Sequence, residues 1–452
     1  MGRQAPISLL GLSLAALFVG TGPGALAREP RGALVPDFLL LDQKGRAHEL
    51  ARLDGKAVVV FVTGNGCPLA RQSVPALKEL RKAYFERGVT FWMLDANLQD
   101  DRAGIAKEGE ALDVDRIPIL HDETEVVAHA LGATHTGEAI AIALPERRIF
   151  YMGPVDDRLA VGGQRTEAQH LYLRDAIEER LAGHAIVTPS VPAAGCAVGY
   201  EPPRGSTWAA DVAPIVGRRC AGCHASGGAK PPLGDYAHAR AAAVGLRRVL
   251  LERSMPPAAP DSHDGAPLAE GLVLPADEAR TLARWLDAGT PRGDGDGTAS
   301  PVAEALRVGH EIRAVSAEAI TIPAGEGEAG RAFGLYRFPR PSLIHDFRPR
   351  MDRRGSWFKY EALYPDGRRE TLFSLPAFAG PWRQTYALAQ PKRVPAGTLL
   401  YATGGFDNSR RNPANPAPER RLTCVAPACD ELFLGVVGVS EEAAGAPPRS
   451  AP

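Results

Sequence analysis

The sequence has no excess of charge of either sign and no long apolar run after its first residues. Lys and Arg number 52 against 53 Asp and Glu, so the formal net charge is −1, and the composition favours neither nucleic acid nor an acidic membrane surface as a partner. After residue 27 no stretch approaches the roughly 18 apolar residues of a membrane-spanning helix. The sequence therefore predicts no nucleic-acid partner and no membrane span.

The N-terminus, residues 1–27, has the pattern of a secretory signal peptide. Arg3 supplies a positive charge, residues 7–19 are apolar, and residues 25–27 read Ala-Leu-Ala, a small-x-small cleavage site. The apolar run is too short to span a bilayer as a stable anchor. We therefore expect a mature protein that begins near Arg28 and is exported, to the periplasm or a comparable compartment.

The rest of the chain divides into segments of different periodicity. A buried-strand run at 57–63 is followed by helical spacing at 68–86, which is typical of an α/β domain. A helix over 166–181, begun by a Thr N-cap, is expected to close that domain. Pro/Gly-rich stretches predict linkers, and short runs broken by Gly and Pro predict strands. The predicted order is a thioredoxin-like α/β domain (28–185), a linker (186–207), an all-α domain (208–290), a second linker (291–300), an all-β sandwich (301–440) and a disordered tail (441–452).

Residues 220–224 read Cys-Ala-Gly-Cys-His, which is the C-x-x-C-H attachment signature of c-type haem. The two thiols can reach the two vinyl groups along one porphyrin edge, and His224 is then carried beneath the iron as its proximal ligand. The alternatives are half of a zinc site, which needs a second pair of ligands, and a redox pair, which normally opens a helix after a strand. Cys220 and Cys223 instead follow a predicted helix, so the sequence favours one covalent haem c.

The haem iron then needs a sixth ligand, and Met255 is the only methionine between His224 and residue 291. It stands in Ser-Met-Pro-Pro after a predicted helix, and the two prolines restrict the backbone that would hold its thioether over the metal. His238 and an open coordination site are the alternatives. Ligation by Met and His raises the reduction potential and favours electron transfer over oxygen chemistry.

Residues 208–290 resemble a small class I cytochrome c domain. The C-x-x-C-H motif, a Pro-Pro-Leu loop at 231–233, the Met255 segment and a final helix with Trp285 follow one another in the order of that family. The resemblance implies one covalent haem c, with Cys220 and Cys223 attached and His224 and Met255 on the iron. It also implies an electron-transfer role, with a redox partner that the sequence does not name.

Cys67 falls where a predicted strand ends and a predicted helix begins. The helix dipole and the free N–H groups at such a position stabilise a thiolate and lower the pKa of the thiol. This placement, and the order of strands around it, resemble the thioredoxin-like redoxin family. The resemblance implies a catalytic thiol, and Cys196 is a candidate partner for it. A structural thiol or a plain Cys67–Cys196 disulfide is the alternative.

Three features of the redoxin family are altered in this sequence. Ala70 stands where a dithiol enzyme has its second Cys, Gly64 and Val60 replace the Thr and Pro of a peroxiredoxin, and Thr136-Gly137 replaces the usual Thr-Pro. The sequence therefore predicts the fold of that family with altered resolving, peroxidase and substrate-binding positions.

Residues 340–437 resemble the C-terminal half of copper type II, ascorbate-dependent monooxygenases, with matching stretches at 359–367, 391–398 and 430–432. The copper ligands of that family are missing: its His-x-His pair aligns with residues 349–352, and after residue 300 the only histidines are His310 and His345. The sequence argues against copper and predicts a binding or packing domain. A surface disulfide between Cys424 and Cys429 is expected, because an exported compartment permits it.

Three functional hypotheses follow. The first, which we favour from the sequence, is an exported electron-transfer protein with haem c and a fused thioredoxin-like domain. The second is a thiol-dependent oxidoreductase that acts on peroxide or disulfide through Cys67 and exchanges electrons with the haem. The third is a relative of the copper monooxygenases that serves as a binding scaffold. The sequence leaves open whether the protein is an enzyme; any activity is expected to be that of an oxidoreductase.

Overall fold

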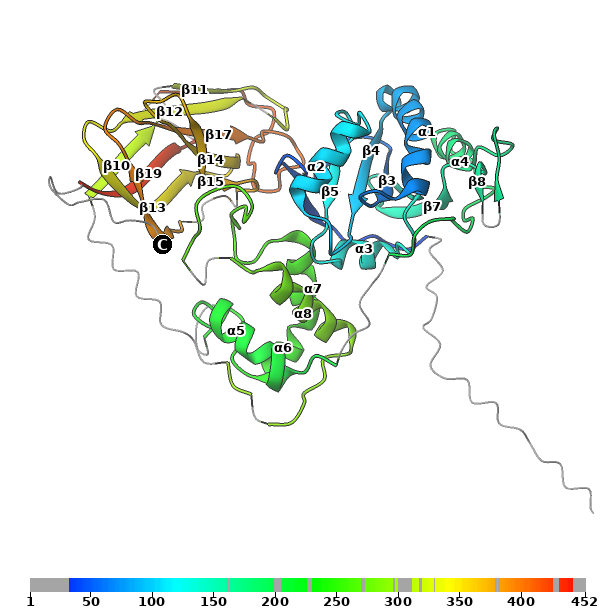
Figure 1. The fold of residues 1–452 in the computed structure, drawn as a ribbon, viewed down its shortest axis with the longest axis horizontal. Helices are drawn as coiled ribbons and strands as arrows, with labels where there is room; N and C mark the ends of the chain where they lie inside the picture. The colour runs from blue at the N-terminus through cyan, green and yellow to red at the C-terminus, as the bar shows by residue number, and fades with distance from the viewer. Residues whose placement is uncertain are drawn as a thin grey trace, which may run out of the picture.

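The computed structural model contains an α/β unit (within 32–198), a helical unit (within 205–299) and a β unit (within 311–441), and Figure 1 shows the helical unit below the other two. The predicted signal peptide, Cys429 and the predicted tail after Glu441 lie outside the described residues. None of the described helices is long and apolar enough to cross a membrane. The described residues are 32–160, 163–198, 205–225, 230–269, 273–295, 297–299, 311–316, 319–328, 330–378, 380, 383–425 and 431–441.

A seven-stranded sheet forms the centre of the α/β unit, with strands in the order β2-β1-β5-β4-β3-β6-β7. β3, β4 and β5 run parallel to one another, and the other strands are antiparallel to their neighbours. The carboxyl ends of the three parallel strands therefore meet at one edge of the sheet. The strands are β1 (Leu39–Asp42), β2 (Ala47–Glu49), β3 (Ala57–Thr63), β4 (Val89–Asp95), β5 (Ile119–His121), β6 (Glu138–Ala143) and β7 (Arg148–Pro154), with a separate hairpin of β8 (Leu159–Ala160) and β9 (Gly163–Gln164).

Both faces of this sheet are covered, which explains why β3 is buried along its whole length and apolar up to its last residue, Thr63. Val59 and Phe61 point into the core formed with α1, α2 and α4, whereas Val58 and Val60 point into the core formed with α3. The helices are α1 (Pro68–Tyr84), α2 (Arg102–Ala111), α3 (Val126–Leu131) and α4 (Tyr172–Leu181). The predicted strand at 57–63 and the predicted helix start at residue 68 are confirmed.

The start predicted for the last helix of this unit was wrong. α4 begins at Tyr172 and not at residue 166. The carboxylate of Asp157 accepts hydrogen bonds from the backbone N–H groups of Gln169 and His170, at 2.8 and 3.1 Å. Those bonds hold the preceding stretch as a loop on the end of β7, so the Thr N-cap is not used.

The first part of the predicted linker at 186–207 was also interpreted wrongly. Residues 189–198 pack against the sheet: the N–H of Val191 donates to the carbonyl of Met152, and Val198 is buried in the core on the α3 face. These contacts are tertiary, so the Pro/Gly composition of the stretch did not predict them. Their consequence is that Cys196 belongs to the α/β unit.

Two tryptophans form the centre of the helical unit. The rings of Trp208 and Trp285 are fully buried with centroids 6.0 Å apart, and their indole N–H groups donate to the carbonyls of Gly297 (2.5 Å) and Pro291 (3.0 Å). These bonds hold part of the predicted second linker, 291–300, on the unit. The helices are η3 (Trp208–Val212), α5 (Ala213–Arg219), α6 (Tyr236–Ala241), α7 (Ala243–Glu252) and α8 (Ala276–Asp287). The single helix predicted over 236–252 is two helices, because Ala242 leaves the helical backbone conformation (φ −84°, ψ 2°).

The β unit consists of two four-stranded antiparallel sheets, β10-β19-β13-β16 and β12-β17-β14-β15, with a separate β11-β18 pair. One core lies between the sheets: Phe347 stacks on Phe373 at 5.3 Å, and Phe358 stacks on Phe433 at 4.9 Å. The all-β prediction for this region is confirmed. The strands are β10 (Glu311–Ser316), β11 (Ala319–Ile322), β12 (Arg331–Arg337), β13 (Ser342–Met351), β14 (Gly355–Leu363), β15 (Arg369–Leu375), β16 (Tyr386–Val394), β17 (Leu399–Phe406), β18 (Leu422–Val425) and β19 (Phe433–Glu441).

Residues 256–269, here called the bridging segment, leave the helical unit directly after Met255 and contact both other units. On the β unit, the hydroxyl of Tyr386 donates to the carbonyl of Ala258 at 2.7 Å, and Leu268 forms an antiparallel bridge with Leu388. On the α/β unit, Asp261 pairs with Arg102 at 2.5 Å, and His263 bonds to Glu123 at 2.8 Å. The helical unit adds an apolar contact of its own, because Leu251 and Ala283 belong to the core on the α3 face of the sheet.

The His263–Glu123 contact predicts a pH-dependent stability. His121, Arg102 and Asp261 face the pair. The hydrogen bond to Glu123 raises the pKa of His263 above its usual 6.5, so its contribution is complete below pH 6.5 and is lost as the pH rises through the folded-state pKa. Burial by itself raises the pKa of Glu123, but its bond to His263 and the nearby positive charges lower it from 4.5 to about 2. The contribution of Glu123 is therefore present above pH 4.5 and is lost as the pH falls toward 2.

We expect His263→Gln to lower the midpoint of thermal unfolding most between pH 4.5 and 6.5, by on the order of 1–2 °C because the pair is partly exposed. The difference from the wild type should shrink as the pH rises through the raised folded-state pKa of His263. Differential scanning fluorimetry of the two proteins across this range checks the prediction. A difference that does not change with pH would contradict it.

Candidate functional site

Cys67 ends the short loop that joins β3 to α1. Its backbone N–H donates to the carbonyl of Gly64 at 3.1 Å, which closes the turn. The backbone N–H of Asn65 donates to the carboxylate of Asp100 at 3.0 Å, so the loop is held from the end of the neighbouring strand β4 as well. Cys67 is the N-cap residue of α1, at the strand–helix junction that the sequence predicted for it.

Cys196 reaches Cys67 from the segment that packs on the sheet after α4. The two Sγ atoms are 3.3 Å apart, although the residues are separated by 129 positions. Backbone pairing places them, since the carbonyl of Cys196 accepts a hydrogen bond from the N–H of Thr136 at 2.9 Å. Gly195 allows this approach: a Cβ at that position would lie 1.8 Å from the carbonyl oxygen of Thr136. The structure thus brings together the two cysteines that the sequence proposed as partners, and the disulfide between them stays a prediction.

The side chain of Thr136 contacts both cysteines. Its Oγ1 lies 3.0 Å from the Sγ of Cys67 and accepts the backbone N–H of Cys196 at 3.0 Å. Because this oxygen already accepts from an N–H, its own O–H proton can be donated to sulfur. In the sequence, Thr136-Gly137 counted only as a change in the Thr-Pro motif of the redoxins. The structure shows that the change leaves a threonine hydroxyl beside the thiol.

The pKa values of the two thiols are shifted in opposite directions. Burial by itself raises the pKa of Cys67, but hydrogen bonds from the Thr136 hydroxyl, the Ala70 N–H and Cys196 outweigh it, so the pKa is lowered. The hydrogen bond to Cys67, followed by burial, raises the pKa of Cys196. Cys67 is 7% exposed, whereas Cys196 is open to solvent. The pair therefore combines a buried thiol that ionises readily with an exposed thiol that ionises less readily.

A buried carboxyl group lies beside this site and was not predicted from the sequence. Asp95 ends β4 and pairs in register with Thr63, the last residue of the strand that leads to Cys67. Burial, together with the nearby carboxylate of Asp100, raises the pKa of Asp95 to about 8. Its Oδ2 atom is buried with no hydrogen-bond partner among the described residues. Asp95 therefore carries a proton at neutral pH, at the same sheet edge as the two thiols.

Gly195→Ala is expected to separate the two cysteines. The new Cβ would overlap the backbone of Thr136, which cannot move aside as a flexible side chain can. A displacement of about 1 Å can reduce the rate of a positioned reaction on the order of 100-fold, and we expect formation of the Cys67–Cys196 disulfide to slow to that extent. Timed alkylation and peptide mass mapping measure the rate. Gly163→Ala is the matched control, because nothing lies within 4 Å of a Cβ at that position, and an unchanged rate in Gly195→Ala would contradict the expectation.

The C-x-x-C-H residues follow α5 on the helical unit. Cys220 is partly buried and Cys223 is exposed, and burial, followed by the charges of Glu278 and Cys223, raises the pKa of Cys220 to about 11. A redox-active C-x-x-C pair needs a lowered thiol pKa, so this environment is unlike that of such a pair. The Nδ1 of His224 donates to the carbonyl of Pro231 at 2.7 Å, which leaves Nε2 as the nitrogen with a free lone pair. Met255 follows α7 and is 42% exposed, unusually open for a methionine.

Where the resemblance to copper enzymes would place two histidine ligands, the β unit has Arg350, which donates to the carbonyl of Gln384 at 3.1 Å, and Asp352, which pairs with Arg383 at 3.2 Å. Met351 is completely buried in the core between the two sheets, and His345 bonds through Nε2 to the hydroxyl of Ser440 at 2.8 Å. Within the described ranges, no group of three or more His, Cys, Asp or Glu side chains is arranged to hold a metal ion. Cys424 lies on β18, and its predicted partner Cys429 is outside the described residues.

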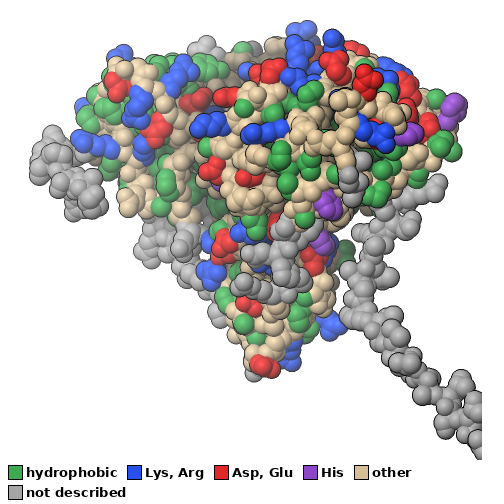
Figure 2. Space-filling model, turned by 45° about the vertical axis from the view of Figure 1, so that its right-hand side comes forward, with side chains coloured by type: hydrophobic (Ala, Val, Ile, Leu, Met, Phe, Trp, Pro, Cys, Tyr) green, Lys and Arg blue, Asp and Glu red, His purple; other side chains and the backbone are tan. Residues whose placement is uncertain are grey.

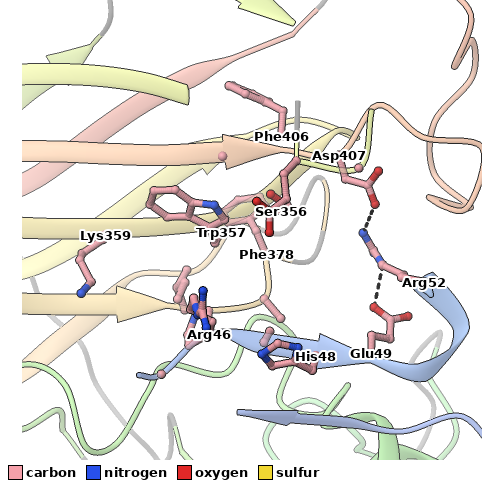
Figure 3. Close-up of a pocket in the computed structure, with 18 of the residues that line it drawn as sticks. Arg46, His48, Glu49, Arg52, Ser356, Trp357, Lys359, Phe378, Phe406 and Asp407 are labelled. Atoms are coloured by element: carbon pink, nitrogen blue, oxygen red, sulfur yellow. Dashed lines mark hydrogen bonds and ion pairs between the residues drawn. The ribbon is translucent and has the colours of Figure 1, made fainter. Parts of the chain in front are cut away.

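A cavity of about 930 Å³ lies where β2 and the short helix η1 (Leu50–Arg52) face the β12-β17-β14-β15 sheet. Figure 3 shows Arg52 between Glu49 and Asp407, each at 2.6 Å, with Trp357 and Phe406 along the β-unit wall. Sequence reasoning missed this cavity because its walls come from opposite ends of the chain. On the face of the molecule that Figure 2 shows, Lys and Arg side chains are interspersed with Asp and Glu.

Residues 32–154 match the AhpC/TSA family model. The thiol-disulfide oxidoreductase ResA of Geobacillus thermodenitrificans (strain NG80-2) is 31% identical over 101 residues, which are 22% of this chain and 56% of that protein. ResA of Bacillus anthracis is 35% identical over 69 residues, 15% of this chain and 40% of that protein. The chain thus spans about half the length of the curated relatives it matches.

Solved structures also match part of the chain. A hypothetical protein of Sinorhizobium meliloti 1021 has 28% identity and a TM-score of 0.34, covering 37% of this chain and 93% of its own. A putative thiol:disulfide interchange protein DsbE of Chlorobium tepidum has 16% identity and a TM-score of 0.26, covering 34% of this chain and 96% of its own. The residues that match the family model all lie within the α/β unit.

Proposed function

We propose that this protein, whose α/β unit is a thioredoxin-like domain of the AhpC/TSA type related to thiol–disulfide oxidoreductases, exchanges electrons with thiols and disulfides through Cys67 and Cys196. The observation that carries the proposal is the 3.3 Å separation of the two Sγ atoms beside the N-terminus of α1. Ala70 stands where a C-x-x-C motif has its second cysteine and has no thiol. Cys196 supplies the second thiol instead. The similarities therefore support the second of the three hypotheses from the sequence, and not the electron-transfer hypothesis that we favoured.

The chemistry requires only the two cysteines and a substrate. When the dithiol reduces a substrate disulfide, one sulfur–sulfur bond forms between Cys67 and Cys196 and the substrate bond breaks. Two electrons and two protons pass to the substrate, which leaves as two thiols. The hydroxyl of Thr136 and the N-terminus of α1 stabilise the thiolate of Cys67 whenever this sulfur is not in a disulfide. The protonated Asp95 lies at the same sheet edge and can hold a proton near the site.

The proposal is tested by a redox titration of the full-length protein. The protein is equilibrated with mixtures of reduced and oxidised glutathione, free thiols are blocked, and the peptides with Cys67 and Cys196 are mapped by mass spectrometry. We expect a reversible disulfide between these two residues with a defined midpoint. A chain in which they stay reduced at every ratio, or in which the disulfide is never reduced, would overturn the proposal.

The helical unit supports a second function, the carriage of one covalent haem c. The residues fit that group: Cys220 and Cys223 have the attachment spacing, and the Nδ1–H of His224 is held by the Pro231 carbonyl, so that Nε2 can bind iron. Met255 has an accessible thioether that would serve as the sixth ligand. When bound, haem c would supply one-electron transfer. The N-terminal signal pattern supports export, where such a protein would meet its redox partner.

Met255→Ala is expected to remove the weak thioether-to-iron absorption band of the haem-loaded protein and to lower its reduction potential, because a thioether ligand raises the potential. Absorption spectroscopy and potentiometry measure both effects. The neighbouring Ser254→Ala leaves the thioether in place and serves as the control. An unchanged band and potential in Met255→Ala would mean that another residue, such as His238, is the sixth ligand.

A further inference from the structure

We propose that Cys196 is the thiol that exchanges with the substrate and that Cys67 is the buried thiol that resolves the mixed disulfide, an order that rests on the proposed function. In this order the cysteine at the helix N-terminus never bonds to substrate. The sequence suggested the opposite, because it marked Cys67 as the catalytic thiol and Cys196 as its partner.

Access to the two sulfur atoms is the first argument. Cys67 is 7% exposed, while Cys196 is exposed. The stretch from 195 to 198 lies over Cys67, and two backbone hydrogen bonds hold it there. The N–H of Thr136 donates to the carbonyl of Cys196 at 2.9 Å, and the N–H of Val198 donates to the carbonyl of Thr134 at 2.9 Å. A substrate sulfur could reach Cys67 only after this stretch had been lifted, whereas it can reach Cys196 directly.

The leaving group is the second argument. Thiol–disulfide exchange is faster when the departing sulfur has the lower pKa. Despite burial, the pKa of Cys67 is lowered, and the hydrogen bonds that it receives from the Thr136 hydroxyl and the Ala70 N–H contribute to this without needing the thiol of Cys196. In the oxidised protein, attack on the sulfur of Cys196 therefore releases Cys67 as a thiolate that these two donors stabilise. Attack on Cys67 would instead release Cys196, to which no backbone N–H of α1 donates among the described residues.

The resulting sequence of steps is balanced. An external thiolate attacks the Sγ of Cys196; the new sulfur–sulfur bond forms, the Cys67–Cys196 bond breaks, and the electron pair stays on Cys67. A second external thiolate then attacks the substrate sulfur of the mixed disulfide, and Cys196 departs and takes up a proton. Two thiols have become one disulfide, and the protein has become the dithiol. In the reverse direction Cys196 attacks a substrate disulfide, and the Cys67 thiolate displaces the substrate from Cys196.

The test uses the full-length protein with Cys67→Ser and Cys196→Ser as a matched pair, each treated with oxidised glutathione. We expect Cys67→Ser to accumulate glutathione on Cys196, located by peptide mass mapping. Cys196→Ser should form an adduct on Cys67 at least about 10-fold more slowly. The sulfur of Cys67 is buried beneath residues 195–198, and a serine at position 196 keeps that stretch in place. Equal rates, or a faster reaction at Cys67, would overturn the order of attack.

A measurement on the wild type keeps the test independent of how the variants fold. The oxidised protein is mixed with reduced glutathione and quenched with acid at short times, and the mixed disulfide is mapped. Glutathione on Cys196 supports the order that we propose, and glutathione on Cys67 overturns it. A wild-type protein that forms no Cys67–Cys196 disulfide to begin with would overturn the proposed function itself, so the two failures are distinguishable.

Discussion

Cys67→Ser is expected to lower the rate of thiol–disulfide exchange at least on the order of 1,000-fold. Both half-reactions pass through the Cys67–Cys196 disulfide, and loss of either cysteine prevents that disulfide from forming. The variant keeps the size of the side chain at the N-cap of α1, and serine is itself a good N-cap residue. The fold should therefore persist while the internal disulfide can no longer form. Turnover of a glutathione-based disulfide substrate, followed by thiol release, measures the loss.

The matched control for this variant is Thr136→Val, which keeps the shape of the side chain and removes the hydroxyl beside Cys67. It should raise the pKa of Cys67 and slow exchange at neutral pH, and the rate should recover as the pH is raised. Cys67→Ser should not recover at any pH. Exchange at the wild-type rate in Cys67→Ser would show that turnover does not pass through the Cys67–Cys196 disulfide.

The second large effect is expected on the helical unit. Replacing both Cys220 and Cys223 with serine should reduce covalently bound haem to background in a protein produced with haem attachment, because both thioether links are lost. Cys220 packs against the core around Trp208 and Trp285, and serine at this position costs little volume. Haem staining after denaturing electrophoresis and the reduced pyridine spectrum measure the loss. Haem that stays attached through denaturation in the double variant would contradict the expectation.

The two centres provide controls for each other. Cys67→Ser should retain its haem, and the Cys220, Cys223 double variant should still form the disulfide between Cys67 and Cys196. The reason is structural: Cys67 and Cys196 are held by β3, α1 and the segment that packs beside Thr136, whereas the C-x-x-C-H residues follow α5 on another unit. Loss of both properties in either variant would indicate a general folding defect.

The sequence predicted those elements of the fold whose pattern is local. The buried run at 57–63 identified β3 to the residue, and the helical spacing from residue 68 identified the start of α1, which ends at Tyr84 and not at the predicted residue 86. The start of α4 was missed because Asp157, on the preceding strand connection, binds the backbone before Tyr172. The stretch at 189–198 looked like a linker because its Pro/Gly content says nothing about the sheet edge that it pairs with.

The candidate site could be predicted only in part for the same reason. Strand–helix placement singled out Cys67, and the count of remaining cysteines suggested Cys196. No local pattern marks Gly195, whose importance comes from a backbone that approaches from far away in the sequence. Thr136 appeared as a departure from a motif, and its role is visible only once both sulfur atoms are placed around its hydroxyl. The raised pKa of Asp95 results chiefly from burial, which no local sequence pattern shows.

The bridging segment has a consequence for how the molecule melts. Units joined by flexible linkers commonly absorb heat in separate steps, one for each core. Here residues 256–269 hydrogen-bond to the β unit and pair ionically with the α/β unit, and Leu251 is part of the sheet's own core. Opening any one unit therefore removes contacts from its neighbours. Calorimetry should record fewer transitions than there are units, and amide hydrogens of α7 should exchange together with those of β1 and α3, which it contacts.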